Sequence, residues 1–321
     1  MTDLTRRNML AGASLAAAGA VAPAQAAAPA TGKQAPSIYR YRIGDMEVTA
    51  IYDGVWYRPI DEKFIRKANY ADVQRAMSDA FMPEAKLATP FTMLLVNTGK
   101  KLILLDTGTG GQVASTAGAF SENLIAAGID PKTIDQIVIS HFHPDHINGI
   151  KTKDNALIFP NAEIMVPAAE WAFWSDDANM RAAPDGLKIV FHNVRRIFND
   201  IAKDVTHYQP GKVVAPGVET VAAPGHTPGH TVFAIQSGKD AMMVLSDTTQ
   251  HPALFARNPE WEPQFDIDGA AAVTTRKKLL DRVAADRMLV TGYHFPFPAC
   301  GHIVKTATGY EHVPLLWDTA I

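Results

Sequence analysis

Short runs of apolar or alternating residues predict strands along much of the chain, because successive side chains of a strand face opposite sides of its sheet. Two of these runs are separated by Asn97-Thr98-Gly99-Lys100, which is typical of a turn, so the pair is predicted to form a β-hairpin. The predicted strands of this first half are Tyr39–Ile43, Glu47–Tyr52, Thr92–Val96, Leu102–Leu105 and Gln136–Ser140.

Helical periodicity follows the strands in each half of the chain. One helix is predicted over Ser121–Ala127, and a longer one over Ala270–Ala285. A second strand-rich stretch, Val213–Ser246, precedes the longer helix, and Met288–Thr291 follows it as a strand. The same order of elements occurs twice, which predicts an αββα sandwich of the mixed α/β class, with helices outside two sheets.

The composition narrows the class of protein. The 321 residues are 47% hydrophobic and 20% charged, as in a globular protein with a substantial core, and we expect one domain over residues 37–321. The net charge is −3 and the lysines and arginines are scattered, so we expect no nucleic-acid partner. Cys300 is the only cysteine, which excludes an intramolecular disulfide.

The first residues resemble a twin-arginine export signal. Thr5-Arg6-Arg7-Asn8-Met9-Leu10 precedes a weakly apolar stretch that runs to about Ala22, and Ala24-Gln25-Ala26 fits a cleavage site. The alternative is a membrane anchor, but the apolar run has about half of the ~20 residues that a spanning helix needs. We therefore expect residues 1–36 to be a signal peptide and linker, and the mature protein to be periplasmic without a stable membrane anchor.

The densest group of chemically active residues is His141-Phe142-His143-Pro144-Asp145-His146, directly after a predicted buried strand. His141 and His143 are two residues apart, so in extended backbone their imidazoles face the same side and can bind one cation. Asp145 and His146 follow where the chain bends and face a second position, at the ~3.5–4 Å spacing of two-metal sites.

Two protein ligands are not enough to coordinate either cation, because catalytic zinc usually takes at least three protein ligands. Three further candidates follow predicted strands: His226 in Gly225-His226-Thr227-Pro228-Gly229-His230, Asp247 in Ser246-Asp247-Thr248, and His294 in Gly292-Tyr293-His294-Phe295. A chance histidine-rich loop or a structural zinc site is the alternative. Closed structural sites favour cysteine ligands, which this sequence lacks.

The ordered set HxHxDH, GHTPGH, SDT and a late histidine resembles the metallo-β-lactamase superfamily over nearly the whole mature chain. The resemblance implies one metal held by His141, His143 and His226, a second held by Asp145, His146 and His294, and Asp247 as the bridge between them. It also implies that His230 supports the ligand loop. Asp106 is expected to orient the histidine loop, with turn capping as an equal alternative.

Within the superfamily, an aspartate at position 247 argues against true β-lactamases. The sequence is most similar to methyl parathion hydrolase-like enzymes and the neighbouring acyl-homoserine lactonases, in Tyr41-Arg42-Ile43-Gly44-Asp45, Phe159-Pro160-Asn161-Ala162 and Gly301-His302-Ile303. That resemblance implies an aromatic substrate wall at Trp174 and Phe191. Val113 stands where that family has another aromatic, which weakens an aryl-phosphotriester assignment.

The expected cofactor is a pair of divalent cations, with zinc first, although such ligands also accept iron, manganese or cobalt. A hydroxide shared by the two metals is the expected nucleophile, and Asp145 or Asp247 is the expected proton acceptor. We therefore expect a hydrolase that cleaves lactones or esters of a small-molecule substrate. Phosphotriester hydrolysis is the first alternative, and a β-lactamase or a non-catalytic metal-binding protein is the weaker one.

Other aromatic and histidine residues have simpler explanations. The aromatic residues of segment 168–198 are expected to pack in the core: Trp171, Phe173, Trp174, Phe191 and Phe198. Five histidines lack ligand spacing and are expected outside the site: His192, His207, His251, His302 and His312. The N-terminal arm, Ile38–Asp53, is expected to pair with a partner subunit in a homodimer.

Overall fold

The computed structural model describes residues 31–83 and 85–321, and Pro36–Ile321 form one compact unit. The predicted signal peptide lies almost wholly outside the described residues, so export stays a prediction. Within the described part of the chain, no helix combines the length and apolarity that crossing a membrane requires.

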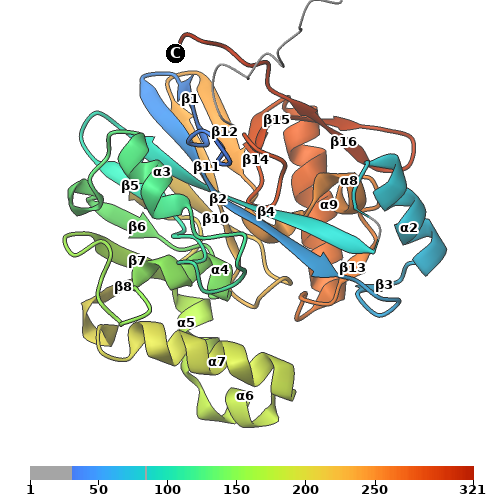
Figure 1. Ribbon diagram of the computed structural model, residues 1–321, viewed down its shortest axis with the longest axis horizontal. Helices are drawn as coiled ribbons and strands as arrows, with labels where there is room; N and C mark the ends of the chain where they lie inside the picture. Colours follow the sequence, from blue (N-terminus) through green and yellow to red (C-terminus); the bar gives the residue numbers. More distant parts are fainter. Residues whose placement is uncertain (1–30, 84) are drawn as a thin grey trace, which may run out of the picture. The chain divides into compact units, whose positions relative to one another are not determined.

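Two seven-stranded sheets form the centre of this unit (Figure 1). The first sheet is antiparallel through β5 and parallel from β5 to β8. Its strands, in spatial order, are β1 (Ile38–Ile43), β2 (Met46–Pro59), β4 (Lys86–Asn97), β5 (Leu102–Leu105), β6 (Gln136–Val138), β7 (Glu163–Pro167) and β8 (Val205–Tyr208).

The second sheet packs on the first through a shared core, in which Val48 and Leu94 of the first sheet meet Phe233 and Met242 of the second. Its strands, in spatial order, are β16 (Tyr310–Pro314), β15 (Cys300–Lys305), β14 (Leu289–Thr291), β12 (Asp240–Val244), β11 (Thr231–Ser237), β10 (Val218–Ala222) and β9 (Val213–Ala215). A separate small sheet joins β3 (Ile65–Arg66) to β13 (Glu262–Pro263).

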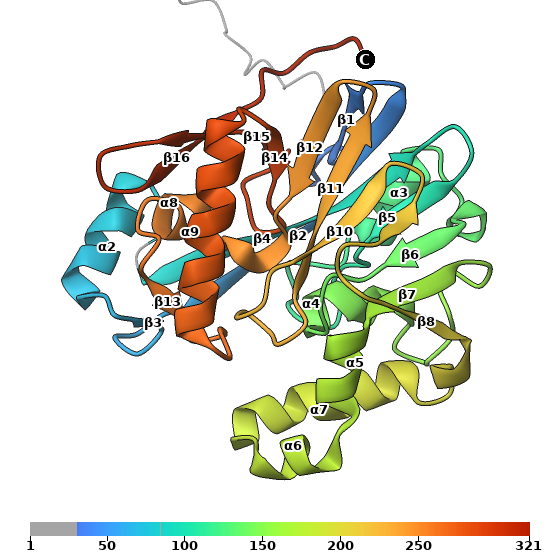
Figure 2. The same cartoon turned by 180° about the vertical axis from the view of Figure 1, so that it is seen from behind.

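Helices cover the outer faces of both sheets (Figure 2). A core cluster joins the first sheet to α3 (Phe120–Ala126), α5 (Ala168–Ser175) and α7 (Asp185–Phe198). Another cluster joins the second sheet to α9 (Gly269–Ala285). The remaining helices are α2 (Tyr70–Asp79), α4 (Pro144–Ile147), α6 (Asp177–Ala182) and α8 (Pro252–Phe255). The predicted αββα sandwich is therefore confirmed.

The element boundaries differ from the sequence prediction most clearly at three strands. β4 begins at Lys86 instead of Thr92, and it pairs with β2 as far as Pro59. β2 extends to Pro59 instead of ending at Tyr52, because a register shift between Tyr52 and Gly54 breaks the alternation without ending the pairing with β4. β6 ends at Val138 instead of Ser140, so the residues that lead into His141 are already outside the strand.

The loop after β5 docks against the segment after α4. Thr107 donates hydrogen bonds to the carbonyl of His146 from its amide, at 2.9 Å, and its hydroxyl, at 2.8 Å. Gly149, in the 3-10 turn η2 (Asn148–Ile150), lies so close that a Cβ there would be 1.8 Å from the carbonyl oxygen of Thr107. Close approach at this position therefore requires glycine.

We expect Gly149→Ala to lower the free energy of unfolding by about 1–3 kcal/mol, because the added methyl group forces the two loops apart. Gly186→Ala is the matched control, since it lies in α7 and a Cβ there meets no atom within 4 Å. Urea unfolding of the three proteins measures the effect. A midpoint of Gly149→Ala equal to that of the control would contradict this account of the packing.

Candidate metal centre

The seven predicted ligands all lie in loops or short turns between strands. His141 and His143 follow β6, and Pro144 begins α4, so Asp145 and His146 lie in its first turn. His226 lies between β10 and β11. Asp247 lies in the 3-10 turn η4 (Ser246–Thr248) after β12, and His294 follows β14. Because the ligands come from both sheets, packing of the sheets brings their loops together.

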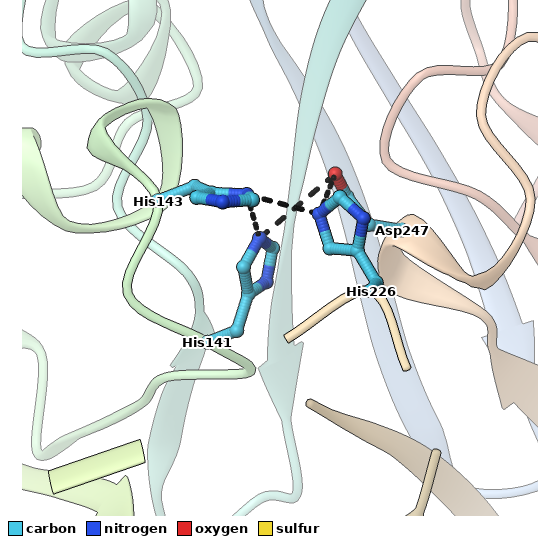
Figure 3. A group of neighbouring side chains, drawn as sticks. All are labelled: His141, His143, His226 and Asp247. Carbon is cyan, nitrogen blue, oxygen red and sulfur yellow. Dashed lines mark hydrogen bonds and ion pairs between the residues drawn. The ribbon is translucent and has the colours of Figure 1, made fainter. Parts of the chain in front are cut away.

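Four of these residues form a first group, drawn in Figure 3: His141, His143, His226 and Asp247. Nδ1 of His143 lies 3.0 Å from Nε2 of His141 and 2.9 Å from Nε2 of His226. Oδ2 of Asp247 lies 3.3 Å from Nε2 of His226 and 3.9 Å from Nε2 of His141. Three imidazoles and one carboxylate thus converge on one point.

Asp247 also belongs to a second group, with Asp145, His146 and His294. Nε2 of His294 lies 2.9 Å from Oδ2 of Asp247 and 3.6 Å from Oδ2 of Asp145. Nε2 of His146 lies 3.1 Å from Oδ1 of Asp247 and 3.6 Å from Oδ2 of Asp145. In each group the donor atoms lie within 4.8 Å of one another, so each group could hold one cation.

The nitrogen and oxygen atoms of the two groups are better suited to bind metal ions than to form hydrogen bonds with one another. Nε2 of His146 and Oδ1 of Asp247 are both buried and have no hydrogen-bond partner among the described residues, although they lie 3.1 Å apart. A buried polar atom without a partner is costly, and a bound cation would satisfy both atoms. Imidazole and carboxylate together are ligands that zinc and similar divalent metals accept.

The electrostatics divide the histidines into two kinds. Burial lowers the pKa of His141 and of His143 well below the usual value. Burial also opposes charge on His146 and His226, but facing carboxylates, Asp247 above all, raise the pKa of His146 well above normal and that of His226 to about 9. Burial disfavours the charged form of Asp247, yet the surrounding imidazoles hold its pKa well below normal.

Asp106 contacts the histidine loop, which is the first of the two roles that the sequence left open. Its Oδ2 lies 2.9 Å from Nδ1 of His146 and accepts a hydrogen bond from the hydroxyl of Ser140 at 2.7 Å. The backbone amide of Ser140 donates to Oδ1 of Asp106, and Oγ of Ser140 lies 3.0 Å from Nδ1 of His141. A carboxylate at Nδ1 holds the ring so that Nε2 faces the metal position.

Asp266 has the same relation to His226, and sequence reasoning missed it. Its Oδ1 lies 2.8 Å from Nδ1 of His226, and its Oδ2 accepts a hydrogen bond from Arg276 at 3.2 Å. Arg276 is almost fully buried and donates its other hydrogen bonds to backbone carbonyls of Thr248, Pro259 and Trp261. The guanidinium of Arg276 thus holds the carboxylate of Asp266 in place, and that carboxylate in turn orients His226.

Glu170 is a second residue that sequence reasoning missed. It lies in α5, is fully buried, and accepts hydrogen bonds from the amides of Phe142, at 3.0 Å, and Gly229, at 2.7 Å. Nε1 of Trp174 donates to it at 2.7 Å. One carboxylate therefore ties the loop of His141 and His143 to the loop of His226.

Two neighbours complete the support of Asp247 and α4. Nδ1 of His230 lies 2.9 Å from the carbonyl of Ala223, and Nε2 accepts from the amide of Asp247 at 3.2 Å. Burial lowers the pKa of His230 to about 3, so this ring stays neutral in its supporting role. The ring of Tyr293 stacks on His146 at 3.9 Å, and its hydroxyl donates to the carbonyl of Asp145.

Core packing and a substrate wall were both predicted for Trp174 and Phe191, and the structure shows the core packing. Trp174 and Phe191 are both fully buried, and the ring of Trp174 lies 6.3 Å from that of His143, so it packs against a ligand. Val113 is half-buried beside the same core cluster. Direct contact of these three residues with substrate stays a prediction.

The other predicted assignments concern packing and unused histidines. Phe198 joins Trp174 and Phe191 in the core, and Trp171 and Phe173 pack against it, as expected. The five remaining histidines belong to neither ligand group; His251, the nearest to Asp247 in sequence, accepts a hydrogen bond from the amide of Ala253 and caps α8.

Comparison with known proteins agrees with this geometry. A sequence model of the metallo-beta-lactamase superfamily matches residues 90–292, a range that contains every ligand except His294. An N-acyl homoserine lactonase from a Bacillus species is 24% identical over 252 residues, which cover 70% of this chain and 92% of that protein.

Two solved structures are also similar. One is AidC, named a dizinc quorum-quenching lactonase and solved with a homoserine product; it is 29% identical, with a TM-score of 0.83, over 88% of this chain and 99% of its own. The other is AbOPH, named a hydrolase in the beta lactamase superfamily; it is 27% identical, with a TM-score of 0.83, over 89% of this chain and all of its own.

We expect zinc binding to the metal-free protein at pH 7 to release about two protons, because the raised pKa values of His146 and His226 keep both rings protonated until a cation displaces the protons. The apparent affinity for zinc should therefore rise with pH up to about 9. Calorimetric titration in two buffers of different ionisation enthalpy counts the protons. A proton count of zero would show that the two rings are already neutral.

We expect Glu170→Gln to weaken zinc binding by about 10- to 100-fold. Three N–H groups donate to Glu170, and the glutamine amide would place one of its own N–H groups opposite one of these donors, so that one hydrogen bond is lost. Glu122→Gln is the control, since Glu122 is exposed on α3. Competition with a coloured chelator measures the affinity of each variant. Equal affinities in the two variants would remove Glu170 from the support of the site.

Proposed function

Because the chain belongs to the metallo-beta-lactamase superfamily, we propose that it is a binuclear metal-dependent hydrolase that opens lactone rings. The observation that carries the proposal is the pair of ligand groups that share Asp247, one with three histidines and the other with Asp145 and two histidines. A single carboxylate common to two groups would hold two neighbouring cations, as in the two-metal sites of hydrolases.

Two bound divalent cations, with zinc as the first candidate, would lower the pKa of a shared water to about 7 and so supply hydroxide at neutral pH. The residues of the chain orient this chemistry. Five of the seven ligand residues are buried, whereas His143 and Asp145 keep some exposed surface, so the centre opens on their side.

Asp145 is the better placed of the two predicted proton acceptors. Its side chain is 17% exposed, and one oxygen faces His146 and His294 at 3.6 Å. Asp247 is almost fully buried, and Gln250 donates a hydrogen bond to its Oδ2 at 2.9 Å. We therefore assign proton transfer during ring opening to Asp145 and the bridging of the cations to Asp247.

The choice of lactones over other substrates comes from the relatives. Those that match over most of their length include proteins named as N-acyl homoserine lactonases, and the structurally similar AidC is named a lactonase. The phosphotriester alternative came from the resemblance to methyl parathion hydrolase-like enzymes, and it is weakened by Val113, which stands where that family has an aromatic residue. Twin-arginine export to the periplasm is proposed from the sequence alone.

We expect the zinc-loaded protein to hydrolyse N-hexanoyl homoserine lactone and dihydrocoumarin, and to turn over methyl paraoxon and nitrocefin slowly or not at all. Asp145→Asn should lower kcat by about 100-fold or more, because the amide cannot accept the proton. Asp130→Asn is the control, since Asp130 lies in an exposed turn. Activity is followed by proton release with and without a chelator.

Three results would count against the proposal. Hydrolysis that survives the chelator would remove the metals from the reaction. Faster turnover of methyl paraoxon than of either lactone would favour a phosphotriesterase. No turnover of any of the four substrates would favour a non-catalytic metal-binding protein.

A further inference from the structure

Arg58, near the end of β2, lies inside a box of three aromatic rings. The guanidinium carbon is 4.1 Å from the centre of the Trp56 ring, 4.0 Å from that of Phe265 and 5.0 Å from that of Phe64. Such contacts hold a planar cation against aromatic faces and leave its N–H groups directed outward at the edge. The box therefore fixes where the five donors of Arg58 can point.

These donors have no partner in the described part of the chain, residues 31–83 and 85–321. No hydrogen bond or ion pair joins the guanidinium of Arg58 to any of those residues, and the side chain is half-buried. Burial accordingly lowers the pKa of Arg58 to about 10. None of these unpartnered nitrogens is fully buried, so the donors reach the surface in a position that the aromatic rings fix, where a ligand can accept hydrogen bonds from them.

The box belongs to the surroundings of the metal centre. Phe265 immediately precedes Asp266, whose Oδ1 lies 2.8 Å from Nδ1 of His226. Trp56 pairs with Thr89 on β4, and the next residue, Pro90, presents its carbonyl to His294 at 2.8 Å. The ends of β2, β3 and β13 lie together in Figure 1.

The carboxylate of Asp145 favours the charged form of Arg58 and so partly offsets the effect of burial on its pKa. Asp145 is the carboxylate that acts on this guanidinium electrostatically, and it is one of the two ligand residues with exposed surface. Once cations are bound, the charge of Asp145 is shared with them. The donors of Arg58 then remain available for a ligand.

We propose that Arg58 is a specificity-determining residue, which donates hydrogen bonds to a carbonyl oxygen of the substrate outside the ester that is cleaved. This inference rests on the proposed lactone hydrolysis. The substrate class that it selects is the N-acyl amino lactones, which carry an amide carbonyl next to the ring, over simple alkyl lactones. After ring opening, the same donors retain the amide of the product.

The contact is made equally in the ground state and in the transition state, because the amide is not the reacting group. Its loss should therefore raise KM and leave kcat nearly unchanged. Arg58→Met keeps the apolar stem inside the aromatic box and removes the donors. Arg58→Lys keeps the charge and loses the planar fork. Arg42→Met is the control, because Arg42 is exposed on β1.

We expect Arg58→Met to raise KM for N-hexanoyl homoserine lactone by about 10- to 100-fold and to change KM for γ-decalactone less than about threefold. The KM of Arg58→Lys for N-hexanoyl homoserine lactone should lie between those of the unmodified protein and Arg58→Met. Thermal unfolding of the metal-loaded variants shows whether the fold is kept. Equal changes of KM for the two lactones, or no change for either, would overturn the proposal, since a purely structural role does not distinguish them.

Calorimetric titration with the ring-opened product N-hexanoyl homoserine provides a readout that needs no turnover. Its Kd for the zinc-loaded protein should rise at least tenfold in Arg58→Met and stay unchanged in Arg42→Met. If the unmodified protein opens no lactone, the proposed function fails, but the product titration still decides the role of Arg58. Equal binding by the unmodified protein and Arg58→Met, or no binding by either, overturns it.

Discussion

The constraint on which the rest of the structure depends is the meeting of five imidazoles and two carboxylates in one small, largely buried volume. Such groups are costly to bury without charge compensation. Asp247 makes the meeting feasible because both of its oxygens are used, Oδ2 towards His226 and His294 and Oδ1 towards His146. Divalent cations would supply the positive charge that the two carboxylates still lack.

The supporting network explains why the loops can be irregular and still hold the ligands in place. Asp106, Asp266 and the carbonyl of Pro90 each contact the nitrogen of a ligand histidine that faces away from the centre. Glu170 performs the same task one step further out, on backbone amides instead of imidazoles. The precision of the site therefore comes from buried polar groups anchored on regular elements.

The ligands could be predicted from the sequence because four of them lie within six residues and the others sit in short motifs that follow strands. Asp266, Arg276 and Glu170 could not, because each acts on a residue that is at least 10 positions away, through contacts that exist only in the folded chain. The one available signal was the charge of Glu170 within the otherwise apolar stretch 168–174. Trp174 and Phe191 show the converse: aromatic side chains at roughly helical spacing were enough to predict that they pack in the core, as they do.

The origin of the ligands in two sheets has a consequence for how bound cations would constrain the fold. His141 and His143 extend from the first sheet, whereas His226 and Asp247 extend from the second, and the same division separates Asp145 and His146 from His294. A bound ion would thus act as a cross-link between the halves of the sandwich and close loops of roughly a hundred residues, the length at which such closures restrict an unfolded chain strongly. Removal of the ions would then release a constraint that holds the two halves of the sandwich together.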